Sequence, residues 1–190
     1  MRNSNRKDNR EQEAAQSISL VRRAASGDSE AFGELYSIYF DRIYRYVVYQ
    51  VRDKMTAEDV TEETFVKAWK AIDSCKGKEK TFSPWLYRIA HNQAIDNLRK
   101  QRKYLSTDMG DLAEAGSYEP KEQERLEQQE MLAAISDLPP NQKQVIILRF
   151  IEGLSNQEVA QIMGKRQGAV RMLQTRALVS LRQALGNEEL

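Results

Sequence analysis

Apolar residues recur every three or four positions along most of the chain, with polar residues between them. This period is typical of amphipathic α-helices, and few segments alternate in the two-residue period of a strand. We therefore predict an all-α protein. Its expected helices lie at about residues 17–25, 29–51, 57–72, 84–103, 121–136, 141–152, 155–163 and 167–185.

Residues 153–182 predict two helices joined by a short turn. Ser155 and Glu158 have the spacing of a capping box, Gly164 allows the first helix to end, and a second helix begins near Gln167. Six apolar residues of the second helix share one arc: Val170, Leu173, Ala177, Leu178, Leu181 and Leu185. Residues 164–182 carry five basic side chains and no acidic one. This pattern favours a DNA-binding helix-turn-helix, and the alternative is a helical hairpin with a solvated basic face.

The predicted helices at 29–51 and 57–72 differ in character. The first has an aromatic stripe that indicates core packing. Thr56 and Asp59 have the spacing of a second capping box. On the second helix, Thr61, Phe65, Ala68 and Ile72 point one way, and Asp59, Glu62, Glu63 and Val66 point the other. An acidic stripe beside an apolar residue suits a basic protein partner, or else it is a solvated face.

A basic loop at 73–83 precedes a helix that Ser83 and Pro84 are placed to start. Tyr87, Ala90, Ala94, Ile95 and Leu98 form its predicted buried arc. Arg88, Asn92, Asp96, Arg99 and Lys100 lie opposite, with Trp85 and Ile89. Cations interleaved with an aromatic ring suit a nucleic-acid surface, although Trp85 is equally well explained as a core residue.

Charge divides the chain into two domains. The formal net charge of +1 combines +4 over residues 84–103, +5 over 164–182 and −6 over 104–130. We predict a disordered extension at 1–16, a first domain at 17–103, an acidic flexible linker at 104–120 and a second domain at 121–187.

Several classes of function find no support in the composition. One cysteine, Cys75, allows no internal disulfide, and one histidine, His91, gives no zinc constellation. A passive thiol explains Cys75 better than a redox sensor does. The sequence has no phosphate-binding glycine loop, catalytic grouping, secretory signal or membrane-length apolar run. We expect a cytoplasmic binding protein without cofactor or metal, and not an enzyme.

Three runs resemble bacterial RNA polymerase sigma factors of the extracytoplasmic-function (ECF) group. They are AEDVTEETFVKAWKAI at 57–72, FSPWLYRIAHNQAIDNLRKQRK at 82–103 and LPPNQKQVIILRFIEGLSNQEVAQIMGKRQGAVRMLQTRA at 138–177. The resemblance implies that region 2, the first domain, binds core polymerase and opens the minus-ten promoter element. It implies that region 4, the second domain, binds the minus-thirty-five element, in a stress or envelope response, and that an anti-sigma factor restrains the chain.

The resemblance also implies a role for particular residues. Core polymerase would contact Asp59, Glu62, Glu63, Val66 and Trp69. The minus-ten strand would contact Lys76, Gly77, Lys78, Trp85, Arg88, Asn92, Asp96 and Arg99. The minus-thirty-five element would contact Lys165, Arg166, Gln167, Arg171, Thr175 and Arg176.

The turn and recognition helix depart from the G-T-V-K-S-R run of many relatives, so their base preference does not carry over. The main alternative is a stand-alone helix-turn-helix regulator, which needs no region-2-like domain. A helical adaptor or anti-sigma protein would leave the basic second helix unexplained.

Overall fold

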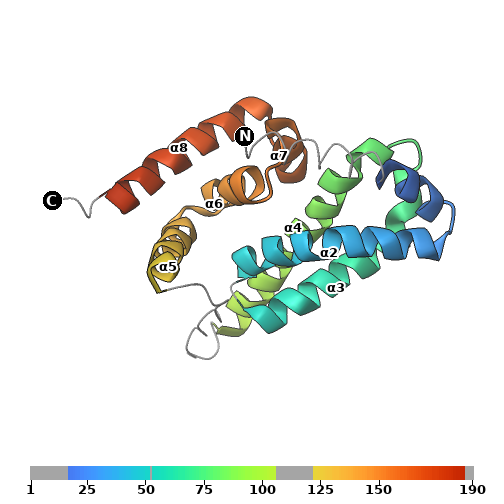
Figure 1. The fold of residues 1–190 in the computed structure, drawn as a ribbon, viewed down its shortest axis with the longest axis horizontal. Helices are drawn as coiled ribbons and strands as arrows, with labels where there is room; N and C mark the ends of the chain where they lie inside the picture. The colour runs from blue at the N-terminus through green and yellow to red at the C-terminus, as the bar shows by residue number, and fades with distance from the viewer. Residues whose placement is uncertain (1–16, 52, 106–121, 187–190) are drawn as a thin grey trace.

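The computed structural model describes residues 17–51, 53–105 and 122–186, and every regular element among them is helical. The predicted extension at 1–16 and residues 106–120 of the predicted linker lie outside the described residues. The all-α prediction is confirmed, with helices grouped into two bundles (Figure 1).

The first bundle begins with a short helix over residues 17–24. It continues with α2 (Ser29–Val51), α3 (Lys54–Ala71), the 3-10 turns η1 (Ile72–Cys75) and η2 (Glu79–Thr81), and α4 (Phe82–Leu105). Helices α2, α3 and α4 contact one another in all three pairings. Aromatic rings fill much of the space between them, including Tyr39 against Phe82 and Tyr46 edge-on to Tyr87.

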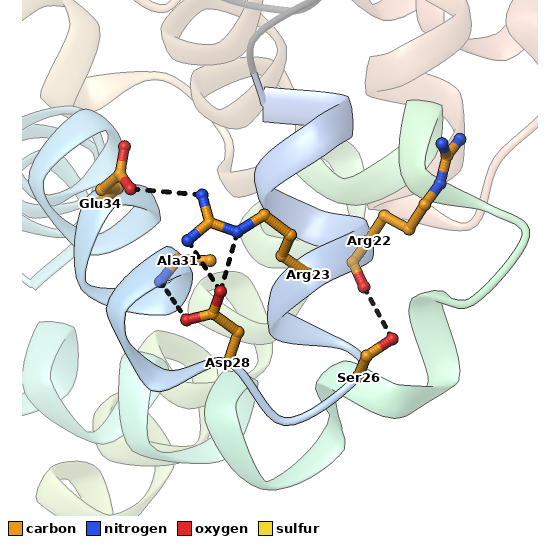
Figure 2. Close-up of polar contacts among 6 residues, drawn as sticks. All are labelled: Arg22, Arg23, Ser26, Asp28, Ala31 and Glu34. Carbon is orange, nitrogen blue, oxygen red and sulfur yellow. Dashed lines mark hydrogen bonds and ion pairs between the residues drawn. The ribbon is translucent and has the colours of Figure 1, made fainter.

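Asp28 fixes the corner between the 17–24 helix and α2 (Figure 2). Its carboxylate accepts a hydrogen bond from the backbone N–H of Ala31 at 3.0 Å, as an N-cap residue does. The other carboxylate oxygen lies 2.7–2.8 Å from two nitrogens of Arg23, whose guanidinium also approaches Glu34 at 3.7 Å. The Ala31 N–H, followed by Arg23, holds the pKa of Asp28 below its ordinary value.

The second bundle contains α5 (Glu122–Asp137), α6 (Pro140–Ile146), the π-helical turn η3 (Ile147–Ile151), α7 (Asn156–Met163) and α8 (Gln167–Gly186). Helix α8 packs against α5, α6 and α7 through Val170, Ala177 and Leu181, which are buried. The two bundles touch where α4 meets α7 and where α2 meets η3 (Figure 1).

Three local predictions are wrong. Helix α3 begins at Lys54, because the side chain of Asp53 accepts from the N–H of Thr56 at 2.8 Å, so no capping box forms at Thr56. Helix α4 begins at Phe82, which places Pro84 one residue inside the first turn. Leu178 and Leu185, which we expected to pack, are exposed because the outer part of α8 has no helix over them.

Candidate functional site

An acidic face on α3 gathers the residues assigned to core polymerase. Asp59, Glu62, Glu63, Val66 and Trp69 are all exposed, and we call these five residues the acidic face. The opposite side of α3 packs inward through Thr61, Thr64, Phe65 and Ala68. The hydroxyls of both threonines donate to carbonyls one turn earlier at 2.7 Å, so they are satisfied inside the bundle. The two faces are therefore separated as the helical period predicts.

An aromatic groove of about 460 Å³ runs along one edge of the acidic face, between α2 and α3. Phe32 lies 4.9 Å from Trp69, and Tyr36 lies 4.7 Å from Phe65, measured between ring centroids. Tyr36, expected in the core, is 37% exposed because it lines this groove. An open groove with aromatic walls beside carboxylates combines apolar contact area with charge, which suits a protein partner.

A polar contact network on the other edge was not visible in the sequence. Gln93 is buried on α4, and its amide donates to Glu63 at 2.7 Å and accepts from the ammonium of Lys67. The amide thus holds two charged side chains of α3 in place. A glutamine at the boundary of the predicted buried arc was the available signal, but its partners are 26 and 30 residues away in sequence.

The loop assigned to the minus-ten element is a tight turn. Gly77 has φ 71°, a conformation that favours glycine, and its N–H donates to the Glu79 carboxylate at 3.2 Å. Lys76, Gly77 and Lys78 are exposed. Arg22, from the helix at 17–24, lies 3.6 Å from Glu79 and ties the turn to the start of the bundle. The sequence analysis gave neither Arg22 nor Glu79 a role.

A polar stripe on α4 continues from this turn, and we define it as Arg88, Asn92, Asp96 and Arg99, all exposed. Their spacing of three and four residues puts them on one side of the helix, with Asp96 and Arg99 paired at 3.7 Å. Trp85 is only partly exposed, because its ring packs 5.7 Å from that of Phe82 against the core. Its two alternatives therefore both have support, a ring edge in the core and a ring edge at the surface.

The predicted helix-turn-helix forms from α7 and α8. Ser155 and Glu158 form the capping box in both directions, at 3.2 and 2.7 Å. Gly164 ends α7 with φ 61° and ψ 33°, and the next N–H, from Lys165, returns to the carbonyl of Ala160 at 2.9 Å. These two ends fix the angle at which α8 leaves the turn.

The recognition face consists of the six residues assigned to the minus-thirty-five element. Arg166, Gln167, Arg171, Thr175 and Arg176 are exposed, and Lys165 is half-buried. Thr175 donates its hydroxyl to the carbonyl of Arg171 at 3.1 Å, which leaves the oxygen as an acceptor. Met172, to which the sequence analysis assigned no contact, is 58% exposed beside Arg171 and offers an apolar contact of the kind that reads a thymine methyl.

Two family models match the chain: "Sigma-70 region 2" over residues 35–104 and "Sigma-70, region 4" over residues 134–183. The chain belongs to the ECF RNA polymerase sigma factors. It is 38% identical over 180 residues to the ECF RNA polymerase sigma factor BldN of Streptomyces coelicolor, covering 93% of this chain and 68% of that protein. It is 36% identical to the ECF RNA polymerase sigma-E factor of Haemophilus influenzae, covering 80% of this chain and 86% of that protein.

The fold resembles a solved structure titled "Structure of CnrH in complex with the cytosolic domain of CnrY". The match has a TM-score of 0.70 at 26% identity and covers 92% of this chain and 99% of that one. The presence of both sigma regions disfavours a stand-alone helix-turn-helix regulator. In the described residues, no helix is long and apolar enough to cross a membrane, and no group of His, Cys, Asp and Glu side chains is arranged for a metal ion.

Proposed function

We propose that this ECF sigma factor docks on core RNA polymerase through the acidic face of α3 and the adjoining aromatic groove. The observation that carries the proposal is the exposure of all five residues of the acidic face along one side of α3, directly beside Phe32 and Tyr36. Exposed carboxylates steer a basic partner, and the groove supplies apolar area for a stable contact.

Promoter DNA is assigned to the other two surfaces. The turn at 76–78 and the polar stripe of α4 hold the minus-ten strand, with a base taken out of the duplex at a cost of a few kcal/mol. The recognition face of α8 lies in the major groove of the minus-thirty-five element, where its cations contact phosphates and Gln167 and Arg171 reach base edges. The chain acts by binding, in the cytoplasm, and performs no catalysis of its own.

An anti-sigma factor is the proposed regulator. The CnrH structure is a complex with the cytosolic domain of CnrY, and its fold covers nearly the whole of this chain. A partner of this kind would compete with core polymerase for the exposed surfaces.

Reconstitution with core polymerase from the source bacterium tests the proposal. The purified chain is added to core enzyme and genomic DNA fragments, and the 5′ ends of the transcripts are sequenced. We expect starts that depend on the chain and share two upstream elements. The absence of chain-dependent starts would refute promoter-specific initiation.

A charge-reversal pair tests the docking surface itself. The Asp59→Lys/Glu62→Lys variant should lose co-elution with core polymerase and keep its helical circular dichroism. The control is Asp41→Lys, an exposed carboxylate on α2 that does not line the groove. Retained co-elution of the double variant, or equal loss in the control, would contradict the assignment of the acidic face.

A further inference from the structure

A buried carboxylate joins the two bundles. Glu152, from the end of η3, is only 1% exposed. One of its oxygens accepts from Nε of Arg45 at 2.9 Å, and the other accepts from the hydroxyl of Tyr87 at 2.7 Å and from a second Arg45 nitrogen at 3.4 Å. These three donors belong to α2 and α4, so the carboxylate of region 4 is satisfied by region 2. A carboxylate without such partners is costly to bury.

The local backbone places Glu152 at this contact. The N–H of Glu152 bonds the carbonyl of Ile147, five residues earlier, at 2.9 Å, which is the wide turn of a π-helix. Gly153 then takes φ 63°, and the N–H of Leu154 returns to Leu148 at 2.8 Å. The chain is fixed on both sides of Glu152, so its side chain points into region 2 without a flexible hinge.

A second polar contact lies beside the first. Gln144 of α6 is buried, and its amide nitrogen lies 2.8 Å from Nδ1 of His91 and 3.4 Å from the hydroxyl of Tyr46. Burial lowers the pKa of His91, which favours the neutral ring that accepts this hydrogen bond. Both contacts join region 4 to α2 and α4, and neither uses a residue of the acidic face, the polar stripe or the recognition face.

The closed arrangement is too short to hold both promoter elements. Elements centred near minus ten and minus thirty-five are about 25 base pairs apart, or about 85 Å along B-DNA. The full length of α4 is about 36 Å and that of α7 about 12 Å, and touching helices lie about 10 Å apart. Because α4 contacts α7 and α7 leads directly into α8, even the sum of these lengths falls short of the spacing.

We propose that Glu152 latches region 4 onto region 2 in the free chain, and that this latch must open before the chain holds both promoter elements. The inhibitory role rests on the proposed function, whereas the latch itself does not. Charge-assisted hydrogen bonds hold the closed state, and water replaces them in the open state. A chain that is mostly closed binds a two-element promoter more weakly, in proportion to its small open fraction.

Glu152→Gln should open the chain. The amide keeps the shape of the side chain but loses the charge that faces Arg45, and we expect the closed-to-open ratio to fall by roughly tenfold or more. Arg45→Gln is the second variant, and it changes a side chain that is 48% exposed, so the fold of region 2 is at little risk. Glu130→Gln, an exposed glutamate on α5, is the matched control.

Energy transfer between two dyes measures the opening in the full chain. The dyes are attached at Ser37→Cys on α2 and Gln183→Cys on α8, both exposed positions. Cys75 stays unlabelled at neutral pH because it is buried and its pKa is raised to about 11. We expect transfer to fall in both latch variants, to stay unchanged in the control, and to fall little further in the double variant. Wild-type transfer in folded Glu152→Gln and Arg45→Gln chains would overturn the latch.

Promoter binding then tests the inhibitory role. The probe is a duplex carrying a two-element promoter recovered in the reconstitution described above. Without core polymerase, Glu152→Gln should bind it about tenfold more tightly than the wild type, and binding should open the wild-type chain. Open latch variants that bind no more tightly would overturn the inhibition. If reconstitution yields no promoter, the proposed function fails on that assay, and the energy-transfer result still decides whether the latch exists.

Discussion

Replacing Gly164 by alanine should destabilise region 4, whereas the same substitution at Gly168 should stabilise it. Gly164 has φ 61° in the turn between α7 and α8, and a Cβ there would meet no other group within 4 Å. The cost is therefore purely conformational, about 1–2 kcal/mol for a left-handed residue with a Cβ. A stiffer unfolded chain offsets about 0.4–1 kcal/mol of it, which leaves a net loss of about 1 kcal/mol.

Gly168 is the internal comparison, because its Cβ would also meet nothing within 4 Å but its backbone is that of the ordinary helix α8. Alanine there should gain about 0.5 kcal/mol. Urea unfolding followed by circular dichroism measures both changes, and hydrogen exchange of the α7 and α8 amides assigns them to region 4. Gly164→Asn should fall between wild type and Gly164→Ala, since asparagine tolerates the left-handed region better. Shifts of the same sign at Gly164 and Gly168 would refute the reasoning.

Three further predictions concern single side chains. Arg171→Ala should weaken minus-thirty-five binding by about 1–3 kcal/mol if it reads a base edge, or lower the salt slope by about one if it contacts only a phosphate, with exposed Arg182→Ala as the control; unchanged binding at every salt concentration would exclude Arg171 from the interface. Because hydrogen bonds lower the pKa of Asp28 from 3.8, its contribution to stability should be complete near neutral pH and vanish as the pH falls below about 4, so urea midpoints of wild type and Asp28→Ala should converge only in acid. The Cys75 thiol, whose pKa burial raises to about 11, should react slowly with a thiol reagent at pH 8 and rapidly after unfolding, and fast reaction in the native chain would contradict its burial.

The sequence predicted best what depends on neighbouring residues. The Ser155–Glu158 capping box, the reversal at Gly164 and the two sides of α3 are set within one or two helical turns, and the structure agrees with each. At the start of α3 two local signals competed, and Asp53 capped the helix one turn before the pattern that Thr56 and Asp59 suggested. The periodicity of α8 was correct, but no local rule reveals that the bundle ends before Leu178 and Leu185.

Contacts between distant segments were not predictable in this way. Gln93 reads as one polar residue on α4 until α3 is packed against it, and Glu152 reads as the charged end of a helix. Their importance comes from partners 26 to 107 residues away. The sequence likewise contained no signal for the π-turn at η3, because five consecutive residues of ordinary helix-compatible type form it. The roles of the acidic face, polar stripe and recognition face remain predictions for the experiments above.

The π-turn makes the length of this segment as important as its composition. A π-turn holds one residue more than an α-turn, and each residue of an α-helix advances the chain by about 100°. A deletion of one residue within Ile147–Ile151 would let α6 continue as a regular α-helix and would rotate everything after it by about that angle. Conservative replacements in this segment keep the register, whereas a deletion that removes only an apolar residue would turn the helix-turn-helix away from region 2. The segment therefore counts residues as a spacer does, although it is folded as a helix.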